Sequence, residues 1–122
     1  ARAGGNLSSR EIVARLGSDA DADSVWDEAA RALAQGLATV TLLLDPAVIV
    51  LGGGFSQAGA ALLHPVTRYL DELLVWRDAP DVVLSRLGGD AGRVGAALLA
   101  FACVDRLEVA DTWVLDAERV PL

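Results

Sequence analysis

Three consecutive glycines follow a short apolar stretch, and they are the residues of this sequence best suited to hold a ligand through the backbone. Gly52, Gly53 and Gly54 come directly after Val48–Leu51. Glycine has no Cβ and adopts positive φ easily, so its N–H groups can closely approach a phosphate or a ribose. Ser56 stands where it could cap a helix whose N-terminus faces the same crevice. We therefore expect a nucleotide at this turn.

Two better-known glycine signatures do not fit these residues. A dinucleotide-binding fingerprint requires glycine or alanine at the sixth position counted from Gly52, where Gln57 stands. A P-loop requires a lysine, and all ten basic residues of this chain are arginine. The sequence also lacks the G-x-S-x-G turn of many hydrolases. The turn is therefore a nucleotide-binding candidate of another type.

The other residues with chemical potential have simpler structural interpretations. His64 is the only histidine and Cys103 the only cysteine, too few ligands for a zinc site. Asp45 precedes a proline and could either contact a ligand or end a helix, and we favour the helix end. In the second glycine-rich segment, residues 87–97, we favour close packing over ligand contact.

The composition indicates one hydrophobic core and excludes several classes of function. The chain has 122 residues, of which 53% are apolar. It contains no methionine, so we expect a piece of a longer protein. The net charge of −7 and the dispersed arginines argue against a nucleic-acid surface. The longest apolar run, residues 37–44, is too short to span a bilayer. A single cysteine and no signal-peptide pattern favour a cytoplasmic location.

Two helices are predicted ahead of the glycines. Ser8 and Glu11 form a capping box that opens a short helix. A longer helix, capped by Ser24, ends at Asp45. Its predicted core face consists of apolar residues at helical spacing, namely Val25, Ala29, Leu33, Leu37 and Val40. Residues 37–44 are apolar nearly all round, so we expect that end of the helix to be buried.

Strands and helices alternate after that point, which completes the order α-α-β-α-β-α. The predicted strands are Val48–Leu51 and residues 82–84, and the intervening helix covers residues 57–76, where Pro65 should kink or divide it. A last helix covers residues 92–106. This order implies parallel strands with helices on both faces. Two strands make a poor sheet, so we expect further strands from upstream chain or from another copy.

Three segments, in this order and spacing, resemble the ROK family of bacterial sugar kinases and transcriptional repressors within the actin-like ATPase superfamily. They are AARALAQGLA at residues 29–38, LDPAVIVLGGG at 44–54 and AGRVGAALL at 91–99. The resemblance implies an α/β fold, a partial actin-like or ribonuclease H-like lobe that is incomplete without upstream strands. Residues 1–107 would be the C-terminal lobe fragment and residues 108–122 a tail, either an edge strand or a surface peptide at 109–115.

The resemblance also implies a ligand set for the parent protein. ATP with magnesium would be the cofactor and a sugar the substrate. Gly52, Gly53 and Gly54 would lie on the adenosine side of the ATP cleft. The family's Asp-x-Gly-x-Thr phosphate loop, its general-base aspartate and its zinc cluster have no counterpart here, so no catalytic residue and no zinc site is assigned. Since phosphoryl transfer needs both substrates positioned, we expect this chain alone to be inactive.

Two parent proteins fit the resemblance. One is a sugar kinase; the other is a repressor that would use a similar lobe for sugar sensing and assembly and carry its DNA-binding unit upstream. We favour the kinase because the complete triple glycine and the Ala-Gly-x-Val-Gly-Ala-Ala pattern are both present. The expected partners are the missing N-terminal lobe and further copies of the chain, as a homo-oligomer, with no nucleic acid and no membrane bound by this segment.

Overall fold

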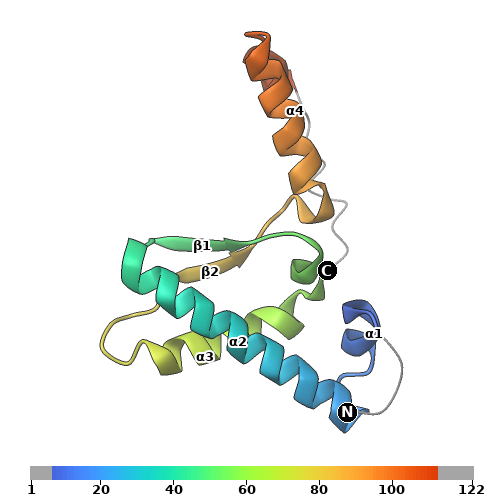
Figure 1. Cartoon of the computed structure of the whole chain (residues 1–122), viewed down its shortest axis with the longest axis vertical. Helices are drawn as coiled ribbons and strands as arrows, with labels where there is room; N and C mark the ends of the chain where they lie inside the picture. The colour runs from blue at the N-terminus through green and yellow to red at the C-terminus, as the bar shows by residue number, and fades with distance from the viewer. Residues whose placement is uncertain (1–6, 113–122) are drawn as a thin grey trace.

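A computed structural model describes residues 7–112 of the chain, and the predicted order α-α-β-α-β-α is confirmed (Figure 1). The elements are α1 (Ser9–Ala14), α2 (Ala20–Leu44), β1 (Val48–Leu51), the 3-10 helix η1 (Gly54–Ala58), α3 (Ala60–Leu73), β2 (Asp81–Leu84), the 3-10 helix η2 (Gly88–Asp90), α4 (Ala91–Cys103) and the 3-10 helix η3 (Leu107–Thr112). The predicted edge strand or surface peptide at 109–115 begins as η3, and its remainder lies outside the described residues.

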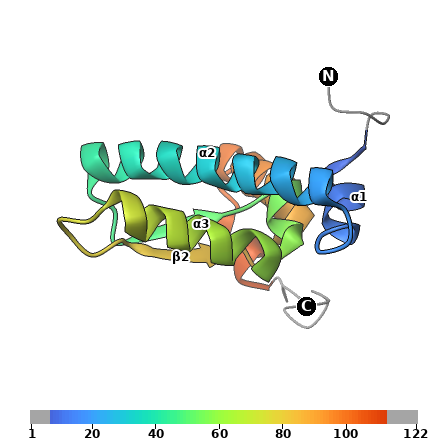
Figure 2. The ribbon, with the colours of Figure 1, turned by 90° about the horizontal axis from the view of Figure 1, so that it is seen from below.

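The two strands form a parallel pair, as predicted, with Val48 opposite Asp81 and Leu51 opposite Leu84. Helices α2 and α3 lie side by side along one face of this pair (Figure 2), whereas α4 leads away from it (Figure 1). On the opposite face, Val48 and Val50 are 50% and 60% exposed. The expected helices on both faces are therefore present on one face only within residues 7–112, and none of the helices described there could cross a membrane.

The N-terminus of α1 is capped as predicted, whereas that of α2 is capped by a different residue. The capping box of α1 is confirmed, because Ser8 Oγ accepts the N–H of Glu11 at 3.3 Å and Glu11 Oε2 accepts the N–H of Ser8 at 2.8 Å. The cap predicted at Ser24 is wrong. Asp19 caps α2 instead and accepts the N–H groups of the second and third helical residues. Aspartate caps as well as serine does, and the acids that follow it suit the positive end of the helix dipole.

The buried face of α2 is lined mainly by alanine. It consists of Ala22, Trp26, Ala30, Ala34, Ala38 and Thr41, which recur every three or four residues. The predicted face, Val25 to Val40, lies one residue away and is half-buried or exposed. The predicted burial of residues 37–44 is also wrong for this chain, since Leu43 and Leu44 are 77% and 75% exposed. Small side chains occupy the buried face of α2 because larger side chains of α3, such as Leu62 and Leu70, fill the space between the two helices.

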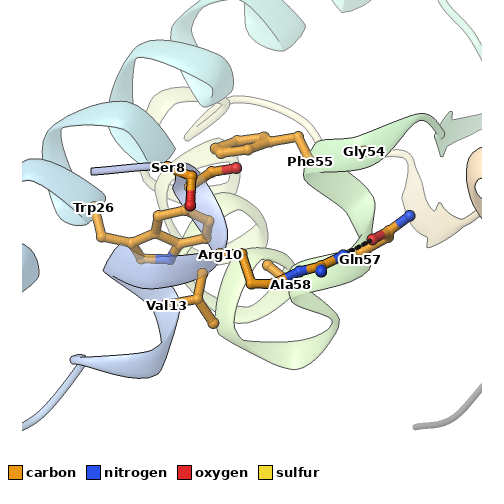
Figure 3. Close-up of a pocket in the computed structure, with 9 residues that line it drawn as sticks. Ser8, Arg10, Val13, Trp26, Gly54, Phe55, Gln57 and Ala58 are labelled. Atoms are coloured by element: carbon orange, nitrogen blue, oxygen red, sulfur yellow. Dashed lines mark hydrogen bonds between the residues drawn. The ribbon is translucent and has the colours of Figure 1, made fainter. Parts of the chain in front are cut away.

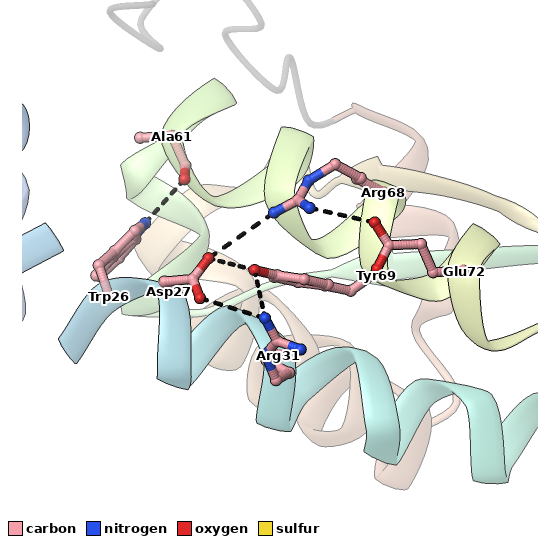
Figure 4. Close-up of polar contacts among 7 residues, drawn as sticks. All are labelled: Trp26, Asp27, Arg31, Ala61, Arg68, Tyr69 and Glu72. Carbon is pink, nitrogen blue, oxygen red and sulfur yellow. Dashed lines mark hydrogen bonds and ion pairs between the residues drawn. The ribbon is translucent and has the colours of Figure 1, made fainter. Parts of the chain in front are cut away.

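Pro65 lies inside α3 without dividing it. Proline has no N–H, so the carbonyl of Ala61, four residues earlier, loses its helical donor. The indole Nε1–H of Trp26 takes that place and donates to the Ala61 oxygen at 2.8 Å (Figure 4). Trp26 is only 5% exposed and packs in the core with α3. A side chain of α2 thus satisfies the backbone group that Pro65 leaves without a partner in α3, and the helix continues.

A polar cluster on the same pair of helices surrounds Tyr69 (Figure 4). Its hydroxyl donates to Asp27 and accepts from Arg31 Nη2 at 3.1 Å. The guanidinium carbons of Arg31 and Arg68 lie 4.3 and 4.1 Å from the centre of its ring. The charged side chains are about half exposed, so their ion pairs add little stability. The cluster fixes the register of α2 against α3 mainly through the buried tyrosine.

Candidate functional site

The three glycines occupy the carboxyl end of β1, where the chain turns into η1. Gly53 has φ +79°, a conformation that side chains with a Cβ rarely adopt. A Cβ added at Gly52 would lie 3.6 Å from Ser85 Cβ, and one added at Gly54 would meet nothing within 4 Å. The fold therefore requires glycine at Gly53, whereas the neighbouring glycines leave the backbone open to a molecule approaching from outside.

Ser56 does not cap α3, contrary to expectation. Its Oγ donates to the carbonyl of Gly53 at 2.7 Å, and the residue is 6% exposed. The chain inserts η1 after the glycines, so α3 begins later, and Gly59, with φ +59°, takes the N-cap position without a side-chain bond. Ser56 thus stabilises the glycine turn through a hydrogen bond within the turn itself.

A second turn lies beside the first because both strands end at the same edge of the parallel pair. After β2, Ser85 donates its N–H to the carbonyl of Leu51 at 2.8 Å and accepts the N–H of Leu87 on its Oγ at 3.2 Å. Helices η1 and η2 are in contact. The close packing that we favoured for residues 87–97 is not seen among the described residues, because a Cβ at Gly92 or Gly95 would meet nothing within 4 Å.

A pocket of about 430 Å³ adjoins the triple glycine (Figure 3). It lies between the start of α1, the beginning of α2 and η1, and Gly54 belongs both to the turn and to the pocket wall. Its lining residues are Ser8, Ser9, Arg10, Val13, Trp26, Gly54, Phe55, Gln57 and Ala58. Sequence reasoning missed this pocket, since its lining residues come from α1, α2 and η1, which are separate segments of the chain. The one available signal was Phe55, an aromatic side chain directly after the glycines.

The remaining candidates lie away from this turn or have structural roles. His64 is exposed on α3 and Cys103 is exposed at the end of α4. Asp45 ends α2 with φ +46° and forms an ion pair with Arg77, which agrees with the helix-end interpretation. Within residues 7–112, no group of three or more histidine, cysteine, aspartate or glutamate side chains could hold a metal ion.

Comparison with known families matches residues 1–102 to the ROK family. The chain belongs to the ROK family. Similar curated proteins are a glucokinase of Streptomyces coelicolor, 40% identical over 92 residues that make up 73% of this chain and 29% of the relative, and a glucokinase of Halalkalibacterium halodurans, 35% identical over 98 residues, or 78% of this chain and 30% of the relative.

A solved structure gives the same result for the fold. A ROK-family glucokinase from Streptomyces griseus, in complex with glucose and AMPPNP, matches 74% of this chain with a TM-score of 0.68 and 35% identity. The predicted α/β lobe of actin-like type is therefore confirmed. The match covers 30% of that glucokinase, so this ROK chain spans less than a third of the length of the relatives it matches.

Proposed function

We propose that residues 1–107 of this chain form the C-terminal, adenosine-side part of an ATP-dependent sugar kinase. The observation that carries the proposal is the open glycine turn at the carboxyl end of β1, in a chain that matches a glucokinase solved with an ATP analogue. The similar proteins found are glucokinases, which favours a kinase over a repressor as the parent. Residues 108–122 would be a tail outside the lobe.

In this proposal the chain binds and orients ATP while other parts of the parent carry out the chemistry. Backbone N–H groups at Gly53 and Gly54 would contact the ribose or phosphates, and fixing the adenosine end aligns the γ-phosphoryl group with a sugar hydroxyl. Magnesium would neutralise charge on the phosphates when bound. Residues 7–112 offer no cluster of carboxylates for that ion, so we assign no step to a metal held by this chain.

The partners in this proposal are an upstream lobe, which supplies the sugar site and the general base, and further copies of the chain. The cell compartment would be the cytoplasm, and the segment would bind no nucleic acid, consistent with its net charge of −7.

Nucleotide titration of this chain tests the glycine turn. We expect ATP to bind with a Kd of about 1 mM, since only one wall of the cleft is present, and to shift the amide NMR signals of the glycine turn. Gly53→Ala should weaken binding at least about tenfold by straining the turn and blocking the approach of the ligand.

Gly17→Ala is the control for placing an alanine at a positive φ away from the glycine turn. Gly17 has φ +77°, nearly the value at Gly53, and neither position has an atom within 4 Å of an added Cβ. Both substitutions should reduce stability, because both place a Cβ at positive φ, whereas only Gly53→Ala should weaken ATP binding. Equal ATP affinity in both variants would remove the glycine turn from the nucleotide site.

A coupled kinase assay tests whether the chain is catalytically incomplete. With ATP, magnesium and glucose, mannose or N-acetylglucosamine, we expect no turnover above the blank, because the general base is assigned to the upstream lobe. Turnover that scales with the concentration of purified chain would contradict this proposal.

A further inference from the structure

Ser56 lies buried inside η1, between two glycines with positive φ. It is 6% exposed, and its Oγ donates to the carbonyl of Gly53 at 2.7 Å. Its own carbonyl accepts the N–H of Gly59 at 3.1 Å. Gly53 and Gly59 have φ values of +79° and +59°. One serine therefore connects the two glycines that flank η1 through its side chain on one side and its backbone on the other.

The peptide between Gly53 and Gly54 is the part of the turn that the Ser56 hydroxyl controls. A trans peptide directs its C=O and its N–H to opposite sides, and the described backbone contains no cis peptide. Because the Gly53 oxygen is directed toward the buried Ser56, the Gly54 N–H is directed away from it. Gly54 is exposed and lies in the wall of the pocket (Figure 3). Among residues 7–112 this N–H has no acceptor, so it can donate to a ligand.

Glycines on both sides give this peptide a second allowed orientation. Gly53 has ψ −171°. Turning the peptide over would bring that angle to about 0° at unchanged φ, a conformation that glycine adopts in type II turns. Gly54 can accept the accompanying change in its own φ because it has no Cβ. Steric repulsion alone therefore does not decide the direction of the Gly54 N–H.

We propose that Ser56 is a positioning residue of the nucleotide site, whose hydroxyl selects the orientation in which the Gly54 N–H can donate to an oxygen of the bound nucleotide. The inference rests on the proposed function, because it needs a nucleotide at the glycine turn. In the other orientation the Gly53 oxygen would face the ligand and repel a phosphate. Without the hydroxyl, the peptide would have to be ordered during binding, and that cost weakens affinity.

NMR titration of three Ser56 variants with ATP tests the assignment. Ser56→Ala removes the hydroxyl, and Ser56→Cys replaces it by a weak donor of similar shape. Each should raise the Kd for ATP about fivefold to tenfold, the effect expected from the loss of one hydrogen bond. Ser56→Thr keeps a hydroxyl, so its Kd should stay within about twofold of that of the unsubstituted chain.

Ser18→Ala is the matched control. Ser18 Oγ donates to the carbonyl of Arg15 at 2.9 Å, also three residues earlier in the chain, and Ser18 does not line the pocket. The control variant therefore loses the same kind of hydrogen bond, and its ATP affinity should not change. Urea unfolding of both alanine variants measures the stability that each bond contributes, so the loss of affinity can be compared with the loss of stability.

The orientation of the peptide is a second readout, which a purely stabilising role of Ser56 would not change. The amide protons of Gly53 and Gly54 lie far apart in the orientation observed and close together in the turned-over one. In the chain without ATP, Ser56→Ala should therefore strengthen the NOE between these two protons, and Ser56→Thr should leave it weak. An unchanged NOE in folded Ser56→Ala would show that the hydroxyl does not set the orientation, and the inference would be overturned.

The outcomes separate this inference from the proposed function. If Gly53→Ala weakens ATP binding but folded Ser56→Ala and Ser56→Cys bind ATP as the unsubstituted chain does, the role of Ser56 is overturned and the kinase proposal stands. An equal loss of affinity in Ser18→Ala overturns it as well. If ATP does not bind the unsubstituted chain, both proposals are overturned. Circular dichroism checks that each variant is folded, and Ser56→Cys decides the result if Ser56→Ala is not.

Discussion

Replacing Trp26 by phenylalanine should destabilise the chain mainly by leaving the Ala61 carbonyl without a donor. Pro65 cannot supply one, so the bond at 2.8 Å from the indole is the contact that satisfies this oxygen. An unsatisfied buried acceptor costs about 1–3 kcal/mol, and since Ala61 is only half-buried we expect the lower part of that range. The smaller ring adds about 1 kcal/mol for lost packing. The free energy of unfolding should fall by about 2–3 kcal/mol in total.

Urea unfolding followed by far-UV circular dichroism measures this change. With a denaturant slope of about 1–3 kcal/mol per molar for a chain of this size, the midpoint should move down by about 1 M. Pro65→Ala provides the decisive second substitution, because an alanine at that position carries an N–H that can bond to the Ala61 oxygen. Pro65→Ala should therefore raise the free energy of unfolding of the Trp26→Phe variant, and it should not do so in the unsubstituted chain.

The double-mutant cycle isolates the hydrogen bond from general effects of removing a proline. Pro65→Ala changes helix propensity and the entropy of the unfolded chain in both backgrounds, and these terms cancel in the cycle. We expect a coupling of about 1 kcal/mol between Trp26 and Pro65. If Pro65→Ala has the same effect with and without the indole, the carbonyl does not depend on Trp26, and the reasoning is wrong.

Three further measurements test other parts of the structure. Hydrogen bonds from Ser8, first of all from its backbone N–H, lower the pKa of Glu11 below 4.5. The capping box should therefore stabilise the chain above pH 4.5 and lose this effect as the pH falls through the lower pKa of the folded state. Glu11→Gln should remove this part of the pH dependence of thermal unfolding. Thr41 Oγ1 is buried without a partner among the described residues, so Thr41→Val should raise the free energy of unfolding in urea by about 1 kcal/mol. The chain should self-associate at micromolar concentration through exposed apolar residues such as Leu43 and Val75, and a monomer in sedimentation equilibrium would contradict this.

The features that the sequence predicted correctly have local causes. The continuous apolar run of β1, the Asp45-Pro46 pair and the capping box at Ser8 each depend on residues within one turn of one another. Backbone preferences and nearby side-chain bonds decide such features, so they can be recognised without knowledge of the rest of the fold. The location of the triple glycine at the end of a strand follows from the same kind of signal.

Apart from the helix caps predicted at Ser24 and Ser56, the wrong or missed features depend on distant contacts. The choice of alanines rather than Val25 and Leu33 for the core face of α2 is made by the side chains of α3 that pack against it. Pro65 is tolerated because Trp26 reaches its partner carbonyl from another helix. The pocket also joins α1 to η1, and only the folded chain brings Arg10 beside Gln57. A pattern within a single segment carries no information on any of these contacts.

The alanine-lined face of α2 sets the distance between α2 and α3, and so limits which sequence changes related lobes can accept there. Ala30 and Ala34 are completely buried where α2 meets α3, so a larger side chain there must push the two helices apart. Because η1 leads directly into α3, such a shift would also move one wall of the pocket relative to α1. Pocket width in related proteins should therefore vary with the volume of these inter-helix residues, even where every residue that lines the pocket is unchanged.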